Sequence, residues 1–167
     1  MLSDPLHPDF LSFSRVLGQR LAVIDESVLT VGDIQVTHPD GPVAVLERKA
    51  RYPYVGRTRR ATWHIDPVGP AFYLDEPRGD SALVPPHGGR FEPRAYVFCD
   101  DGTDLRWKVT SFWKSRYGFC DDNDRCRIEI TDRSLWIPSD DGDWLYLAPL
   151  VFIAILSIRT RPRRFSG

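Results

Sequence analysis

The chain has 167 residues, a formal net charge of −1 and a hydrophobic fraction of 42%. This length is typical of one domain with a substantial core, and the composition argues against wholesale disorder. A net charge close to zero argues against a domain that neutralises a long run of nucleic-acid phosphates, so no nucleic-acid partner is expected.

Residues 1–19 form an N-terminal segment ahead of the main domain. Residues 1–9 are rich in proline, and apolar residues then recur at near-helical spacing between Phe10 and Leu21. This spacing predicts a short amphipathic helix. The first residues lack the basic region and apolar run of a secretory signal, which predicts a cytoplasmic location, or a peripheral position on the cytosolic side of a membrane.

From residue 20 onwards, short apolar runs alternate with turn residues, as is typical of strands joined by tight turns. The clearest hairpin joins residues 94–99 to residues 105–109. Residues 125–131 alternate apolar and charged side chains, which predicts a strand with one buried face. Residues 75–94 are rich in proline and glycine and predict the longest loop. Further strands are predicted at 21–24, 28–31, 34–37, 43–46, 62–65, 71–74 and 135–137.

Three cysteines, Cys99, Cys120 and Cys126, are present without a CxxC pair. This pattern signals neither a disulfide framework nor a zinc site, and we expect three reduced thiols. The acidic clusters at 121–124 and 140–143 are expected to be solvated hairpin turns, because the spacing of an EF-hand calcium loop is missing.

The stretch from Trp144 to Ile158 is uncharged and apolar on every side. As a helix it would be about 22 Å long, short of the roughly 30 Å hydrocarbon core of a bilayer. We therefore expect a buried core helix, with a membrane anchor and a pair of strands broken at Pro149 as alternatives. A proline inside a helix costs about 3 kcal/mol unless it lies in the first turn, so Pro149 should lie there.

The strand-turn-strand units at Asp40-Gly41, Asp101-Gly102 and residues 122–124, and above all the closing sequence DGDWLYLAPLVFIAILSIRTR, resemble the tubby C-terminal-like superfamily. This superfamily includes LURP-one-related proteins and phospholipid scramblases. The resemblance is architectural and implies a mainly β fold, an antiparallel β-barrel of about ten to twelve short strands around a C-terminal hydrophobic helix. It implies a single domain over residues 20–160, followed by a basic tail at 161–167.

The sequence contains no GxSxG, HExxH, GxGxxG or Walker-type motif. We therefore expect a protein that is not an enzyme, with no catalytic residues, no metal site and no cofactor. His64 adjoins Trp63 on a predicted strand, and a packed, hydrogen-bonded histidine is expected there in preference to a catalytic base.

A basic run between residues 48 and 60 is the candidate binding site. If residues 55–60 are extended, two of its arginines project from one face, where their guanidinium groups can grip a phosphate. Some tubby-type domains bind phosphoinositide headgroups through basic side chains on neighbouring strands, so the resemblance favours this run. The alternative is a solvated face or a mobile loop. The run consists of Arg48, Lys49, Arg51, Arg57, Arg59 and Arg60.

These observations predict a non-enzymatic binding module that recognises an anionic partner, such as a phospholipid headgroup, at or near a membrane. One alternative is a tail-anchored membrane protein with a cytosolic β-rich domain. Another is a protein–protein interaction module or structural subunit that uses exposed aromatic residues such as Trp113 and Tyr117. The arginines at 159–164 fit either a helix C-terminus or an anionic-lipid contact.

Overall fold

The computed structural model describes residues 6–25, 32–48, 53–68, 71–75, 81–84, 96–99, 104–138, 144 and 146–160. In this part of the chain, a short 3-10 helix (Phe13–Arg15) precedes twelve strands and one α-helix. The strands are β1 Arg20–Asp25, β2 Ile34–His38, β3 Gly41–Glu47, β4 Tyr54–Thr58, β5 Thr62–Val68, β6 Ala71–Asp75, β7 Ser81–Val84, β8 Tyr96–Cys99, β9 Asp104–Ser111, β10 Arg116–Cys120, β11 Cys126–Ile130 and β12 Ser134–Trp136, and the helix is α1 Leu147–Thr160.

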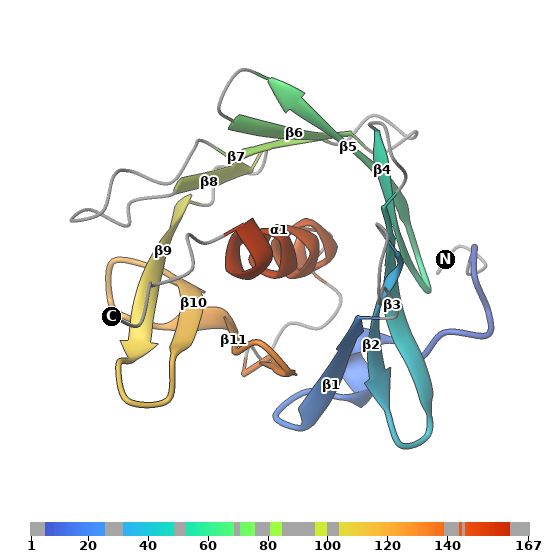
Figure 1. Cartoon of the computed structure of the whole chain (residues 1–167), viewed down its shortest axis with the longest axis horizontal. Helices are drawn as coiled ribbons and strands as arrows, with labels where there is room; N and C mark the ends of the chain where they lie inside the picture. The colour runs from blue at the N-terminus through green and yellow to red at the C-terminus, as the bar shows by residue number, and fades with distance from the viewer. Residues whose placement is uncertain are drawn as a thin grey trace.

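The strands form one closed antiparallel barrel in which each strand pairs with its neighbours in sequence. The first and last strands complete the closure, since Leu21 of β1 lies opposite Leu135 of β12. Figure 1 looks along the barrel and shows α1 surrounded by the strands. The expected mainly β fold, an antiparallel barrel around a C-terminal hydrophobic helix, is confirmed.

The core lies between α1 and the inner faces of the strands. In β1, Leu21 and Val23 are buried while Arg20 and Ala22 are exposed, which is the alternation of a strand with one wet face. Every residue of α1 from Leu147 to Ile158 is buried. A helix that is apolar all round suits this position, because barrel walls cover it on every side. The segment is therefore the expected core helix, and its burial is at odds with the membrane-anchor alternative.

No helix among the described residues has both the length and the apolar character needed to cross a membrane.

Pro149 is the third residue of α1 and lies in its first turn, as expected. The N–H groups of a first turn have no partner within the helix, so the missing N–H of proline costs little there. The regular helical bonds begin one residue later, where the N–H of Leu150 donates to the carbonyl of Tyr146 over 3.2 Å. The alternative of two strands broken at this proline is wrong.

Gly56 on β4 lets the barrel wall approach α1 closely. A Cβ atom at this position would lie 2.3 Å from the Cε2 atom of Phe152 on the helix. Real Cβ atoms do not come that close, so a larger residue would displace the helix or the strand. Glycine at 56 and phenylalanine at 152 are therefore a complementary pair in the core.

Several local predictions differ from the structure. The loop predicted over residues 75–94 contains strand β7, which is short and pairs with β6 on one side and β8 on the other. Strands β4 and β10 were not predicted as separate strands. In place of the short amphipathic helix, the described part of the N-terminal segment has the 3-10 helix, and before it the N–H of Leu11 donates to the carbonyl of Pro42 on the barrel over 2.8 Å. The strand predicted at 28–31 lies outside the described residues.

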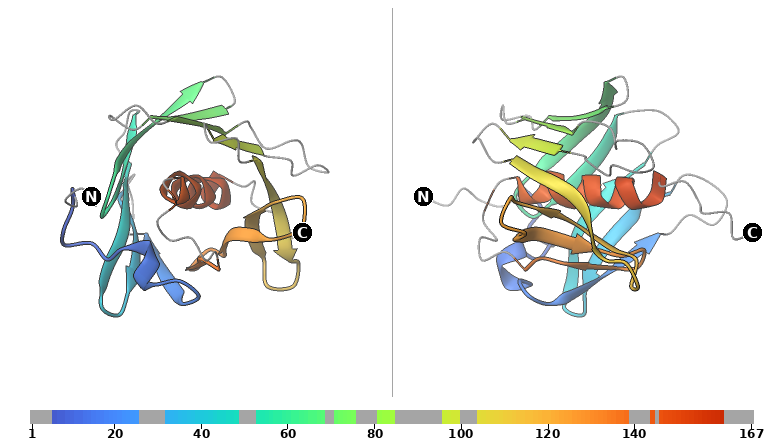
Figure 2. Two further views of the ribbon diagram at one scale, coloured as in Figure 1. Left: turned by 180° about the vertical axis from the view of Figure 1, so that it is seen from behind. Right: turned by 90° about the vertical axis from the view of Figure 1, so that its left-hand side faces the viewer.

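Because neighbouring strands run in opposite directions, successive connections lie at opposite ends of the barrel. We call one the acidic end; it has the β10–β11 turn at 121–125 and the start of α1. We call the other the aromatic end; it has the β9–β10 tip at 112–115, the β11–β12 tip at 131–133 and the last turn of α1. The right-hand view in Figure 2 shows α1 running lengthwise through the barrel.

Candidate functional site

The predicted basic run is divided between the two ends of the barrel. Arg48 directly follows β3 at the aromatic end, whereas Arg59 and Arg60 follow β4 at the acidic end. Arg57 lies within β4, opposite Val45. The other two members, Lys49 and Arg51, lie outside the described residues. The described part of the run is thus not one compact patch.

Two of these arginines form ion pairs within the barrel wall. Arg48 is half-buried, and its NH2 group donates to the two carboxylate oxygens of Asp25 over 3.2 and 3.3 Å. Its Nε atom donates to the carbonyl of Gly32 over 2.9 Å. Arg57 pairs with Glu47 on the neighbouring strand β3. Each positive charge therefore has an internal counter-charge, which weakens its attraction for an external anion.

Arg59 holds the N-terminal segment against the barrel. Its NH1 group donates to the carbonyl oxygens of Pro8 and Phe10 over 2.6 and 2.8 Å. In the same segment, Nε2 of His7 is 2.9 Å from the hydroxyl of Thr62. Burial, and to a smaller extent the charge of Arg57, lowers the pKa of His7, so this histidine is neutral near pH 7. Whether any residue of the run also binds a ligand stays a prediction.

The β9–β10 tip presents two aromatic side chains to solvent. Phe112 is 63% exposed and Trp113 is 93% exposed, and their rings meet edge to face with centroids 5.9 Å apart. The tip is a tight turn in which Ser115 has φ +48° and its N–H donates to the carbonyl of Phe112 over 3.3 Å. An almost fully exposed indole leaves a large apolar area in water, which favours any contact that covers it.

Basic and apolar residues accompany the tip at the aromatic end. Lys114 is exposed beside the two rings, and Arg133 is exposed on the β11–β12 tip. Val109 and Ile24, near the same ends of β9 and β1, are 41% and 47% exposed. The side chain of Arg159 and all of Arg161, Arg163 and Arg164 lie outside the described residues. This combination of exposed rings and positive charge is suited to an interface between water and anionic lipid.

Tyr117, which was considered with Trp113 as an exposed aromatic contact, has a different environment. It is half-buried and stacks on Trp107 with ring centroids 5.4 Å apart and planes only 4° apart. His64 also differs from its prediction, because its side chain is exposed while its neighbours Trp63 and Ile65 are fully buried. The expected packed histidine is therefore wrong, since the alternation of β5 turns residue 64 outward.

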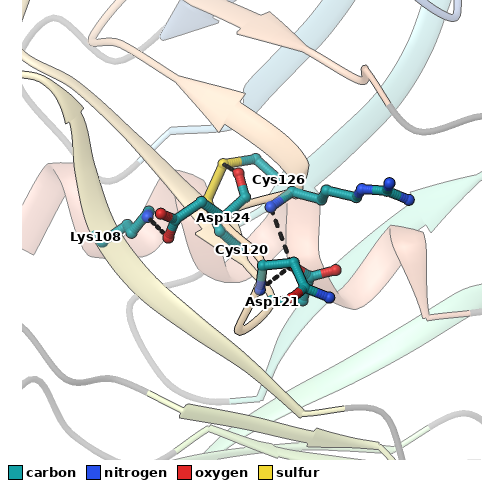
Figure 3. Close-up of a disulfide and its surroundings, with 7 residues drawn as sticks. Lys108, Cys120, Asp121, Asp124 and Cys126 are labelled. Carbon is teal, nitrogen blue, oxygen red and sulfur yellow. Dashed lines mark hydrogen bonds and ion pairs between the residues drawn. A yellow bond between two sulfur atoms is a disulfide. The ribbon is translucent and has the colours of Figure 1, made fainter.

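The acidic end carries a tightly bonded turn, shown in Figure 3. A disulfide joins Cys120 and Cys126, which are cross-strand partners of β10 and β11. The expectation of reduced thiols is wrong for this pair, because the hairpin register brings two cysteines six residues apart face to face. Within the turn, a carboxylate oxygen of Asp121 accepts hydrogen bonds from the N–H groups of Asn123 and Arg125 over 2.9 and 3.0 Å. The side chain of Cys99 lies outside the described residues.

The other two carboxylates of this turn pair with β9. Asp122 binds Arg106, and Asp124 binds Lys108. The cluster at 121–124 is thus an exposed hairpin turn, as expected, although its carboxylates have basic partners. Among the described residues, no three histidine, cysteine or acidic side chains are grouped so as to hold a metal ion. The second cluster, at 140–143, lies outside these residues.

Sequence reasoning named Trp113 only as a protein contact and gave Phe112 no role. The available signal was the pair of adjacent aromatic residues at a position where the chain turns between two strands. Searches against protein-family models, curated proteins and solved structures found no match to this chain. The candidate site is therefore defined by the geometry of the aromatic end.

Proposed function

We propose that this protein is a non-enzymatic binding module that attaches to an anionic membrane surface through the aromatic end of its barrel. The observation that carries the proposal is the exposure of Phe112 and Trp113 on one tip, next to the cationic Lys114. Tryptophan partitions to the interface between lipid and water, where its ring is covered and its N–H stays solvated. A hairpin tip can place both rings at that depth without changing the barrel.

Positive charge supports the same orientation. A lysine or arginine close to an anionic membrane contributes about 1 kcal/mol of attraction. Lys114 and Arg133 are exposed at the aromatic end, where Asp132 is also exposed. The acidic end has Asp121, Asp122 and Asp124 together with Arg60 and Arg125. With the aromatic end on the membrane, Lys114 and Arg133 lie near the lipid and the three aspartates of the β10–β11 turn point away from it.

A phospholipid headgroup is the anionic partner that this arrangement favours. Lys49 and Arg51 closely follow Arg48 in the sequence, whereas the charge of Arg48 itself is offset by Asp25. The architectural resemblance to the tubby-like superfamily, which includes headgroup-binding domains, supports the same class of partner.

Flotation with lipid vesicles tests the proposal. The wild-type protein should bind vesicles of phosphatidylcholine mixed with phosphatidylserine, and bind pure phosphatidylcholine weakly. The double variant Phe112→Ser/Trp113→Ser should lose about tenfold or more in affinity, since tenfold corresponds to about 1.4 kcal/mol and two buried rings supply more than that. Leu6→Ser is the matched control, because Leu6 is 51% exposed on the N-terminal segment, far from the tip in sequence.

Two outcomes would overturn the proposal. One is equal binding to anionic and neutral vesicles, and the other is a double variant that binds as well as the wild type. A third possible result is that the wild type binds no vesicles but binds a specific protein in a pull-down, with this binding lost in Trp113→Ser. That result would favour the protein–protein interaction module over the membrane-binding module.

A further inference from the structure

A groove of about 510 Å³ lies on the barrel wall where β12, β1 and β2 meet. Ala22 of β1 is exposed at its centre, opposite Thr37 of β2 on one side and Ser134 of β12 on the other. The methyl group of Ala22 leaves room that a larger side chain would occupy. None of the residues that line the groove is acidic, and the polar ones are Arg20, Thr37, His38, Arg133 and Ser134.

Arg20 is fixed in place at one side of this groove. Its Nε atom donates to the hydroxyl of Ser134 over 2.9 Å, and its guanidinium lies 5.6 Å from the ring centroid of Trp136. A guanidinium has five N–H donors, so this one bond leaves several for a ligand. Ser134 is only 2% exposed, so its hydroxyl positions Arg20 and does not face a ligand.

Arg133 supplies a second guanidinium. It is exposed on the β11–β12 tip, and its side chain makes no hydrogen bond or ion pair with any described residue. His38 also borders the groove, and its Nδ1 accepts the N–H of Asp40 over 3.1 Å. Two arginines and the hydroxyl of Thr37 thus border one open groove, and the buried Ser134 lies beneath it.

We propose that this groove is a binding site for a phosphate group. Guanidinium groups match the oxygens of phosphate with paired hydrogen bonds, and the hydroxyl of Thr37 adds a neutral donor. A phosphate presents three oxygens and up to two charges to these donors, whereas a carboxylate presents two oxygens and one charge. The ligand is either a free phosphate compound or the headgroup of a lipid, and this site does not require the membrane contact proposed above.

The test is a titration of the isotopically labelled full chain with inorganic phosphate, followed by the backbone amide signals in NMR spectra. The amides of Ala22, Thr37 and Ser134 should shift in a saturable manner, and acetate should shift them less. Arg133→Gln should weaken phosphate binding about tenfold, as expected for the loss of one charge-assisted pair. Ala22→Val, which fills the centre with a residue that favours strands, should weaken it at least as much.

Arg125→Gln is the matched control, because Arg125 is an exposed arginine at the acidic end. Vesicles that contain phosphatidic acid identify the source: competition between them and free phosphate indicates a lipid headgroup, and saturation by free phosphate alone indicates a soluble ligand. The proposal is overturned if phosphate shifts no groove amide, or if Arg133→Gln and Ala22→Val bind phosphate as tightly as Arg125→Gln does.

Discussion

The two ends of the barrel differ in how their polar and apolar groups are used. At the acidic end, the β10–β11 turn has a disulfide, two hydrogen bonds to Asp121, and ion pairs from Asp122 and Asp124 to β9. At the aromatic end, the β9–β10 tip leaves the rings of Phe112 and Trp113 in water. The groups of the first turn bond to one another, whereas the second turn leaves two large rings exposed among the described residues.

The contrast suggests separate roles for the two ends: the acidic end stabilises the fold, and the aromatic end is the proposed binding surface. Bonds within the acidic turn lower the free energy of the folded state and leave little for a ligand. Exposed rings at the aromatic tip contribute nothing to the core, and they are the groups through which we propose that the protein contacts a membrane. Mutations at the acidic end should therefore change the free energy of unfolding, and mutations at the aromatic end should change binding.

The helix α1 connects the two ends, and breaking its packing should have the largest effect. Phe152 is fully buried against Gly56 of β4. Phe152→Ala should lower the free energy of unfolding by about 3–5 kcal/mol, because it leaves a cavity in the centre of the barrel. Urea unfolding followed by tryptophan fluorescence measures this loss, and vesicle binding should disappear at the urea concentration at which the barrel unfolds.

The pairing with Gly56 supplies the control for this prediction. Gly56→Ala should cost about 1–3 kcal/mol in the wild type, because the new methyl group meets the ring of Phe152. In the Phe152→Ala background the same change should be close to neutral, since the ring is gone. Additive costs of the two substitutions would show that α1 does not pack against β4 in this way.

Loss of the disulfide should have an intermediate effect that is confined to stability. Cys120→Ser/Cys126→Ser should lower the free energy of unfolding by about 2 kcal/mol, the value expected when a short closed loop is opened in the unfolded chain. Vesicle binding of the folded protein should stay at the wild-type level, because the turn lies at the opposite end from the aromatic tip.

A reducing agent is the control for the disulfide. It should lower the stability of the wild type to that of the double variant and leave the double variant unchanged. A double variant that is as stable as the oxidised wild type, or one that has lost vesicle binding, would contradict the separation between the two ends.

The fold was largely predictable because it depends on patterns that the chain repeats. The alternation of apolar and charged residues in β11 indicates a strand with one buried and one exposed face. The uncharged stretch that ends at Ile158 indicates a buried helix, which such strands can enclose. Strands β4 and β7 were harder to predict. In β4, Gly56 interrupts the apolar pattern because the ring of Phe152 on α1 leaves no room for a side chain there. Strand β7 is only four residues long, which is too short to show a clear pattern.

The candidate site was less predictable, because it depends on which connections share an end of the barrel. In the sequence, Arg48 and Arg60 belong to one basic run, yet a strand separates them and places them at opposite ends. The sequence alone indicates no partner for Arg57 or Arg59. In the fold, Arg57 pairs with Glu47, and Arg59 donates to backbone carbonyls of the N-terminal segment. The disulfide was missed for the same reason, since only the hairpin register places Cys120 opposite Cys126.

The smallest expected effect concerns the charge of Asp124 at the acidic end. The hydrogen bond from Lys108 and, next, the positive charge of Lys108 lower the pKa of this exposed carboxyl below its ordinary value of 3.8, and Arg106 adds a smaller contribution. A carboxyl whose pKa is lowered on folding stabilises the folded state above its unfolded-state pKa, and that stabilisation is lost as the pH falls through the folded-state pKa.

Lys108→Met should therefore raise the pKa of Asp124 toward the ordinary value and flatten the pH dependence of stability in acid. An NMR titration of the Asp124 side-chain carboxyl measures the shift directly. Arg106→Met should move the same pKa less, because Arg106 is the smaller cause. An unchanged pKa of Asp124 in Lys108→Met would mean that Lys108 does not pair with the carboxylate of Asp124. Asp124 would then remain available to an external cation, and the contrast between a self-satisfied acidic end and an open aromatic end would fail.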